Sequence, residues 1–281
     1  TVTFQSADAN ADSVIWENTA NSSAANYVLK LNGTDHITLK HITFKNLGSS
    51  YSQKIVLYGQ VDSVTIDSSK FLGYQTTSSS SNHASIYGTN NASATGLKIK
   101  NSTFTDGGGY AIYLNNSNTN PITTGLEIIN NTFTDTYSGI YARYYDALTI
   151  RGNTIKGSQM YDRGMYIYYC DGANVIEDNI INAPDMSYGI YLYYCQGTSD
   201  NRPTIVNNLI NTEDYGIYFY PNSYHWDIYY NTIKVRDNYA LYFYYSNSYH
   251  NVKNNIFLTE TTGYPAVHYY YGTSTVSSSD Y

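Results

Sequence analysis

Two carboxylates and a guanidinium are the residues whose types and spacing come nearest to a catalytic pattern. Asp171 lies one sequence repeat after Asp146, and other residues of the chain recur at the same interval. Arg143 lies just before Asp146. Two neighbouring carboxylates could bind Ca²⁺, which prefers oxygen ligands, or serve as the acid and the nucleophile of a glycosidase. The next position at the same interval is Gln196, and two solvated turn aspartates explain the pattern as well. A catalytic site at these three residues is therefore an alternative prediction.

The cysteines and two of the histidines recur at this same interval. Cys170 and Cys195 would have Cα atoms about 5 Å apart in stacked repeats, but side chains in register on parallel strands point the same way. We therefore expect two free, partly buried thiols rather than a disulfide. His225 and His250 end two copies of the sequence NSYH and should stack. Because two histidines without a third ligand make a weak zinc site, no metal site is predicted.

Tyrosine dominates the aromatic composition, with 35 Tyr against 8 Phe and 2 Trp. In segments such as 190–193, apolar residues alternate with Tyr, and this period of two places the Tyr side chains on the outer face of a strand. The predicted binding residues form two outward columns: Tyr141, Tyr166, Tyr168, Tyr191, Tyr193, Tyr218, Tyr220, Tyr242 and Tyr244. An exposed aromatic surface of this size usually marks contact with a glycan or a protein, although stacked aromatic pairs also stabilise a sheet by themselves.

A repeat must position these side chains. Its clearest copies begin at Gly139, Gly164, Gly189, Gly216 and Ala240. Between the copies lies a second motif, in which Asn precedes a short apolar strand, as in NNTF and NTI. Each repeat should therefore contain two short strands separated by Asn, Gly and Ser turns. Stacking of such repeats predicts an all-β, right-handed parallel β-helix of about ten coils, each of roughly 25 residues.

The same alignment predicts the interior. Two inward columns run through the Tyr-rich strands and end at Val267 and Tyr269. The third inward column is Phe44, Phe71, Phe104, Phe133, Ile155, Ile181, Ile210, Ile233 and Phe257. Beside it stands a predicted ladder of side-chain amides: Asn131, Asn153, Asn179, Asn208, Asn231 and Asn255. Stacked amides of this kind can satisfy one another and the backbone of a turn.

Composition and charge limit the classes of partner that the chain is expected to bind. Residues 1–281 are predicted to form one domain, in which residues 1–30 act as an N-terminal cap or entry coil. The net charge is −7 and the 15 Lys and Arg are scattered, so nucleic acid is not an expected partner. No stretch approaches the ~18 apolar residues of a membrane span, so membrane insertion is not expected. The chain begins at Thr1 without Met, as in a mature or excised part of a longer protein.

The GIYLYYC repeat, the NNTF and NTI ladder, the opening TVTFQSA and the closing SSSDY resemble β-helix repeat modules of the pectate-lyase-like superfamily. More narrowly, they are similar to modules of large, repetitive bacterial surface proteins exported by the type IX route. The GHG and RIK motifs of the superfamily's pectin-degrading members are absent. The resemblance implies a secreted or cell-surface location and a non-catalytic structural or adhesin-like module that contacts a glycan, a protein or sister modules. The alternatives are a carbohydrate-binding module and a polysaccharide lyase or glycoside hydrolase.

Overall fold

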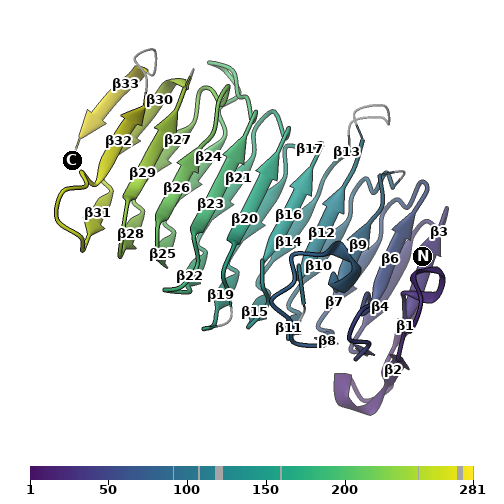
Figure 1. Ribbon diagram of the computed structural model, residues 1–281. Coiled ribbons are helices and arrows are strands. Elements are labelled where there is room, and N and C mark those ends of the chain that lie inside the picture. The colour runs from purple at the N-terminus through teal and green to yellow at the C-terminus, as the bar shows by residue number, and fades with distance from the viewer. Residues whose placement is uncertain are drawn as a thin grey trace.

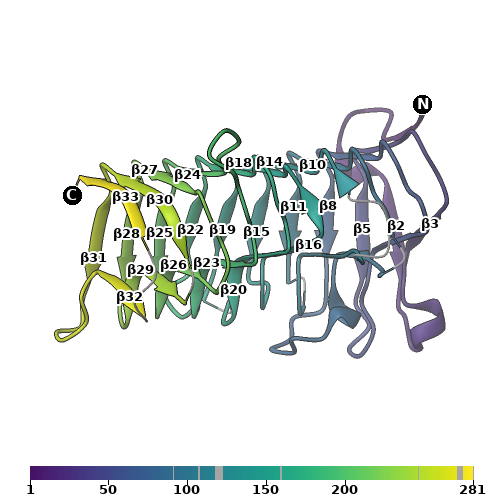
Figure 2. The same cartoon turned by 90° about the horizontal axis from the view of Figure 1, so that it is seen from above.

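A computed structural model describes residues 1–90, 92–106, 108–117, 123–158, 160–245 and 247–270, together with the backbone of 275–280. The chain winds into a parallel β-helix whose coils stack in sequence order, so that the two termini lie at opposite ends of a rod (Figures 1 and 2). Within the described residues, three parallel sheets of 11, 10 and 10 strands run along the rod.

Each coil passes through the three sheets in turn. The first sheet contains β1 (Val2–Gln5), β4 (Ile37–Lys40), β7 (Thr65–Asp67), β10 (Lys98–Lys100), β14 (Glu127–Ile129), β18 (Thr149–Arg151), β21 (Val175–Glu177), β24 (Thr204–Val206), β27 (Asp227–Tyr229), β30 (Ser248–Lys253) and β33 (Thr275–Asp280). The second contains β2 (Ile15–Asn18), β5 (Thr43–Asn46), β8 (Lys70–Leu72), β11 (Thr103–Thr105), β15 (Thr132–Thr134), β19 (Thr154–Lys156), β22 (Ile180–Asn182), β25 (Leu209–Thr212), β28 (Thr232–Val235) and β31 (Ile256–Thr259).

The third sheet carries the tyrosine-rich repeats. It contains β3 (Leu29–Asn32), β6 (Ile55–Tyr58), β9 (Ile86–Gly88), β12 (Ile112–Asn115), β16 (Ile140–Arg143), β20 (Arg163–Tyr168), β23 (Tyr188–Tyr193), β26 (Tyr215–Phe219), β29 (Tyr239–Tyr244) and β32 (Val267–Tyr270). The remaining elements are a two-stranded pair and three short 3₁₀ turns: β13 (Thr123–Thr124), β17 (Tyr145–Asp146), η1 (Ala11–Ser13), η2 (Ser23–Ala25) and η3 (Ser81–His83).

The predicted fold class is confirmed, but the prediction of two strands per coil is wrong because each coil contains three. The missed strands are those of the first sheet, most of which are very short. In β21, for example, only Ile176 is buried, and a strand with one inward side chain shows no recognisable alternation. The column in register with Ile176 nevertheless adds a continuous apolar wall to the core.

The predicted core columns are confirmed by the register and by burial. Ile190 pairs with Met165 on one side and with Ile217 on the other, and all three side chains are fully buried. The columns are more open at the C-terminal end, where Val267 is half-buried and Tyr269 is 37% exposed. This opening arises because no strand of the described residues covers the outer edges of β31 and β32.

The asparagine ladder is also confirmed. Asn208 Oδ1 accepts hydrogen bonds from the backbone N–H and the side-chain amide of Asn179, at 3.0 and 2.9 Å. Asn208 in turn donates to Asn231 Oδ1 through its own backbone and side chain, at 3.0 and 2.9 Å. The residue before each ladder position has a left-handed backbone, as at Asn207 with φ +55°, and this single residue turns the chain from the first sheet into the second. The ladder therefore satisfies the buried polar groups of a tight bend in each of the six coils that carry it.

Candidate functional site

The tyrosines predicted to face outward do so, and seven of the nine belong to a cluster separate from the core. We call Tyr141, Tyr166, Tyr191, Tyr218 and Tyr242 the middle column. Four of its five side chains are only 7 to 9% exposed, so the expectation of an exposed aromatic surface is wrong for these four residues. The rings cover one another along the rod, as in the stacked pair Tyr191 and Tyr218, whose centroids are 4.9 Å apart. Aromatic columns on both sides shield them further.

One of these shielding columns was missed by the sequence analysis. Tyr188, Tyr215 and Tyr239, the flanking column, lie in register at the start of their strands. The ring of Tyr215 stacks on Tyr188 at 5.0 Å and meets Tyr218 edge to face at 4.9 Å. The available signal was a Tyr immediately before Gly189, Gly216 and Ala240, which begin the last three of the five clearest repeats. Position 189 itself has no room for a side chain, because a Cβ on Gly189 would lie 2.6 Å from the carbonyl oxygen of Gly216 on the next coil.

The other shielding column is the one that meets solvent. Tyr168, Tyr193, Tyr220 and Tyr244, the outer column, are all partly exposed. Successive ring centroids are 4.5, 4.9 and 4.9 Å apart, and the last two pairs are nearly parallel. Parallel stacking along the rod covers the ring faces and leaves ring edges and hydroxyl groups toward the solvent. Of the nine predicted binding residues, four in the middle column are therefore buried, and Tyr166 and the four of the outer column are partly exposed.

Two arginines are embedded among the tyrosines. The Arg163 guanidinium lies 4.7 Å from the ring centroid of Tyr166 and 4.9 Å from that of Tyr191. Its Nη1 also donates to both carboxylate oxygens of Asp162, at 2.7 and 2.8 Å. Arg143 lies 5.0 Å from the Tyr168 ring. Such cation–π contacts hold both guanidinium groups in place. The charge of Arg163 is balanced by the Asp162 carboxylate beside it.

The phenols of this surface are not acid–base groups at neutral pH. Burial raises the pKa of Tyr215 to about 12, and the hydroxyls of the middle column are raised at least as far for the same reason. These hydroxyls stay protonated and can donate hydrogen bonds. The chemistry that the surface offers is therefore contact and hydrogen bonding.

Asp146 and Asp171 lie on adjacent coils, as predicted, but both carboxylates accept hydrogen bonds from the backbone of the turn. Asp146 Oδ1 accepts the backbone N–H of Asp171 at 2.8 Å, and Asp171 Oδ1 accepts that of Gln196 at 2.7 Å. Partial desolvation raises the pKa of both carboxyls. Arg143 donates to Asn115 Oδ1 at 3.3 Å instead of to either carboxylate. In the described part of the chain, no three His, Cys, Asp or Glu side chains gather where they could hold a metal ion.

Cys170 and Cys195 are free thiols, fully buried, in a second ladder at the end of the third sheet. The backbone N–H of Tyr145 donates to Cys170 Sγ at 3.4 Å, and that of Cys195 donates to Ser223 Oγ at 3.2 Å. Ser223 continues the ladder by donating its own backbone N–H to Asn247 Oδ1 at 3.1 Å. The two cysteines therefore serve as small acceptors in a turn, a position that serine and asparagine fill in later coils.

A thiol reagent should not react with either cysteine of the folded protein. Burial raises the pKa of Cys195 to about 12, and that of Cys170 also lies well above its usual value, so almost no reactive thiolate forms. We expect no thiol to be titrated in native buffer and two in denaturant, measured with a chromogenic disulfide. Tyr230→Cys, at a site that is 59% exposed, is the positive control and should react within the mixing time. Rapid labelling of the native wild type would contradict the assignment.

The prediction that His225 and His250 stack is wrong because the pairing register is offset by one residue from the NSYH repeat. Tyr224 pairs with Ser248 and not with Tyr249. His225 consequently stacks on Tyr249, with ring centroids 4.9 Å apart. His250 turns inward between two phenylalanine rings, and burial lowers its pKa to about 3. A shift of one residue moves a side chain to the other face of a strand.

A buried lysine is the polar residue that the sequence analysis missed altogether. Lys54 lies in register with Ser85, in a column where later coils have only alanine or glycine, and it is fully buried. Its Nζ has no hydrogen-bond partner among the described residues. Desolvation lowers its pKa to about 7, against a smaller opposing effect of Asp106. The pKa of His83 is lowered by burial and, to a smaller extent, by the nearby charge of Lys54.

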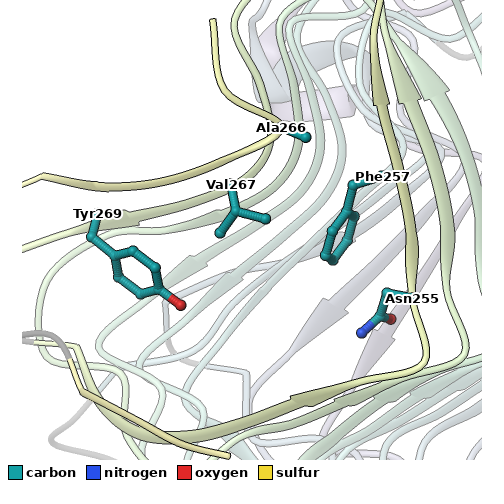
Figure 3. A pocket seen from close by; sticks show the side chains of 5 residues that line it. All are labelled: Asn255, Phe257, Ala266, Val267 and Tyr269. Atoms are coloured by element: carbon teal, nitrogen blue, oxygen red, sulfur yellow. The ribbon is translucent and has the colours of Figure 1, made fainter. Parts of the chain in front are cut away.

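A hollow of about 530 Å³ opens at the C-terminal end of the core between β31 and β32. Phe257, Val267 and Tyr269 point into it, and Asn255, the last ladder residue, lies at its edge (Figure 3). These are the inward residues of the last complete coil. The hollow is therefore the open cross-section of the core and not a pocket in the side of the rod.

This architecture defines a β-helix protein, and the comparison with known families agrees. A family model described as a right-handed beta helix region matches residues 55–257, more than half of the chain, and the chain belongs to that family. The match confirms the predicted β-helix repeat module; export by the type IX route and membership of the pectate-lyase-like group stay predictions. No curated protein matches the chain. The described residues also form no helix long and apolar enough to cross a membrane.

Proposed function

We propose that this chain is a non-catalytic module of a secreted or cell-surface bacterial protein, a rod that contacts a partner through its tyrosine surface. The observation that supports this most is the outer column, whose partly exposed rings extend over four consecutive coils. Tyr and Arg dominate the contact energy of many protein interfaces, and both occur here on a rigid sheet. A rigid aromatic surface loses little conformational entropy on binding.

The ring geometry favours a protein partner over a glycan. A sugar packs on an aromatic side chain by covering the face of the ring, whereas the faces of Tyr193, Tyr220 and Tyr244 are covered by their neighbours. What remains is a row of ring edges and hydroxyls, which suits apolar contacts and hydrogen bonds from another protein or from a sister module. A carbohydrate-binding module is the second candidate. Polysaccharide degradation has less support, because Asp146 and Asp171 already accept backbone hydrogen bonds.

The partner class is tested by binding of the labelled chain to whole bacterial cells. We expect binding to disappear when the cells are treated with protease and to survive periodate, which destroys glycan diols. Binding with the opposite sensitivities would support the carbohydrate-binding alternative. The appearance of polysaccharide fragments in parallel incubations would overturn the proposal that the module is non-catalytic. Sedimentation of the purified chain alone measures whether copies of it associate.

Substitution within the tyrosine surface should separate contact from stability. The double variant Tyr193→Ala and Tyr220→Ala removes two partly exposed rings and should weaken cell binding by at least tenfold. Tyr191→Ala, on the same strand as Tyr193, removes a side chain that is 8% exposed and should instead lower the free energy of unfolding by about 3 kcal/mol. If the double variant binds normally while it loses stability, the surface is purely structural.

A further inference from the structure

Three tyrosines of the outer column are arranged as a row of adjacent phenols. Tyr193, Tyr220 and Tyr244 lie on consecutive coils and are each partly exposed. The ring centroids of both neighbouring pairs are 4.9 Å apart, and the ring planes meet at 15° and 11°. Near-parallel rings at this separation bring each phenol within the reach of its neighbour through ordinary side-chain motion.

Some other tyrosines lack one of the two properties. Tyr191 and Tyr218 stack in the same way, at 4.9 Å, but they are buried and desolvation raises their pKa, so the phenolic proton cannot easily leave for water. Tyr230 is 59% exposed, but its ring contact in the described structure is with Tyr229, at 6.4 Å and 66°. Near-parallel, partly exposed rings also occur as single pairs, Tyr144 with Tyr169 at 5.1 Å and 4° and Tyr188 with Tyr215 at 5.0 Å and 7°. In the outer column such pairing continues over three successive rings.

We propose that Tyr193, Tyr220 and Tyr244 form an oxidative modification site, at which a peroxide-consuming peroxidase joins adjacent coils through dityrosine bonds. Each phenol of a pair loses one electron to the oxidant and its hydroxyl proton to water. The two radicals couple through a new bond between the ring carbons next to the hydroxyls, and each ring then restores its hydroxyl by moving the displaced ring hydrogen to oxygen. One link removes two hydrogen atoms in total, and they reduce one hydrogen peroxide to two waters.

Such bonds would cross-link successive coils along the rod. Tyr193 and Tyr220 belong to successive repeats, as do Tyr220 and Tyr244, so each link closes one complete coil. A cross-link of this kind stabilises a fold mainly by restricting the unfolded chain. The two cysteines supply no such restraint, because both are free and buried. This inference does not depend on which partner the tyrosine surface contacts.

The test is oxidation of the dilute, purified chain with a haem peroxidase and hydrogen peroxide. We expect a monomer that has lost two hydrogen atoms per link, blue dityrosine fluorescence, and cross-linked peptides that join β23 to the segment holding Tyr220, or that segment to β29. The melting temperature should rise by several degrees in the cross-linked monomer. Tyr220→Phe keeps the stacked ring but removes the oxidisable hydroxyl shared by both pairs, and it should lower the yield of links at least fivefold.

Tyr218→Phe is the matched control, because it removes a hydroxyl from the buried middle column on the neighbouring strand β26 and should leave the yield unchanged. The proposal is overturned if oxidation yields no cross-link, or links only between molecules. It is overturned equally if the links within one molecule map to other tyrosines, or if Tyr220→Phe has the wild-type yield. Both variants retain their aromatic rings and should therefore fold like the wild type. The melting temperature before oxidation checks this, because a variant that loses yield by unfolding would melt at a lower temperature.

Discussion

Replacement of Lys54 by methionine should raise the free energy of unfolding at pH 6 by roughly 3 kcal/mol. The folded protein lowers the pKa of this amine from 10.5 to about 7, because the fully buried side chain leaves water without gaining a hydrogen bond. At pH 6 the charge must therefore be buried at a cost. Methionine has a similar length and no charge, and the gain is less than the full desolvation cost because the attraction to Asp106 is lost.

The same shift predicts how stability depends on pH. Between pH 7 and 10.5 the unfolded chain retains a proton that folded Lys54 has released, so wild-type stability rises as pH increases through this window. From pH 7 to 9 we expect a rise of about 2 to 3 kcal/mol from Lys54. Subtracting the Lys54→Met curve from the wild-type curve isolates this contribution, measured by urea denaturation. Measurements stop at pH 9 because tyrosines of the unfolded chain ionise near 10.

Lys98→Met is the matched control for this prediction. Lys98 is 43% exposed and pairs with Glu127 at 2.7 Å on the surface of the first sheet, where an ion pair contributes little. Its replacement should change stability by less than about 1 kcal/mol at every pH. The assignment of Lys54 as a buried, neutralised amine fails if Lys54→Met is less stable than the wild type, or if it keeps the full pH dependence.

Replacement of Asn208 by alanine should lower the free energy of unfolding by about 4 kcal/mol. Its side-chain amide donates to the carbonyls of Ile176 and Val206, at 3.0 and 3.1 Å, and its oxygen accepts two hydrogen bonds from Asn179. Alanine would leave these groups buried without partners. Each such group costs on the order of 1 to 3 kcal/mol. Urea denaturation, with amide hydrogen exchange to locate the weakened coils, measures the effect.

The neighbouring residue provides the control for the ladder. Asn207 is exposed, donates to Asp178 Oδ1 at 2.7 Å and has a positive φ that glycine also tolerates. Asn207→Gly should therefore cost less than about 1 kcal/mol. Asn208→Ser should retain part of the stability, because Ser102 fills the equivalent ladder position and accepts the backbone N–H of Ser69 at 3.1 Å. Equal losses for Asn207→Gly and Asn208→Ala would show that the ladder contributes nothing beyond the turn.

Features that depend on like residues returning at a regular interval are predictable from the sequence alone. The fold class, the inward columns through Ile190 and Phe133, and the Asn179–Asn208–Asn231 ladder all follow from the repeat, because parallel coils in register place equivalent residues one above another. The same repeat placed the two cysteines on adjacent coils as free thiols, whereas the expectation that they are only partly buried is wrong because both are fully buried.

Features that depend on packing between columns or on a single residue were decided by the tertiary structure. Alternation shows that Tyr191 points outward, but only the rings of the flanking and outer columns determine that it is buried. A one-residue offset in pairing places His250 in the core, although its sequence copy, His225, lies near the surface. Lys54 is fully buried at an inward position of its coil, and no local sequence pattern predicts this burial. Burial is a property of the neighbours a side chain meets in space, and for these residues the neighbours come from other coils.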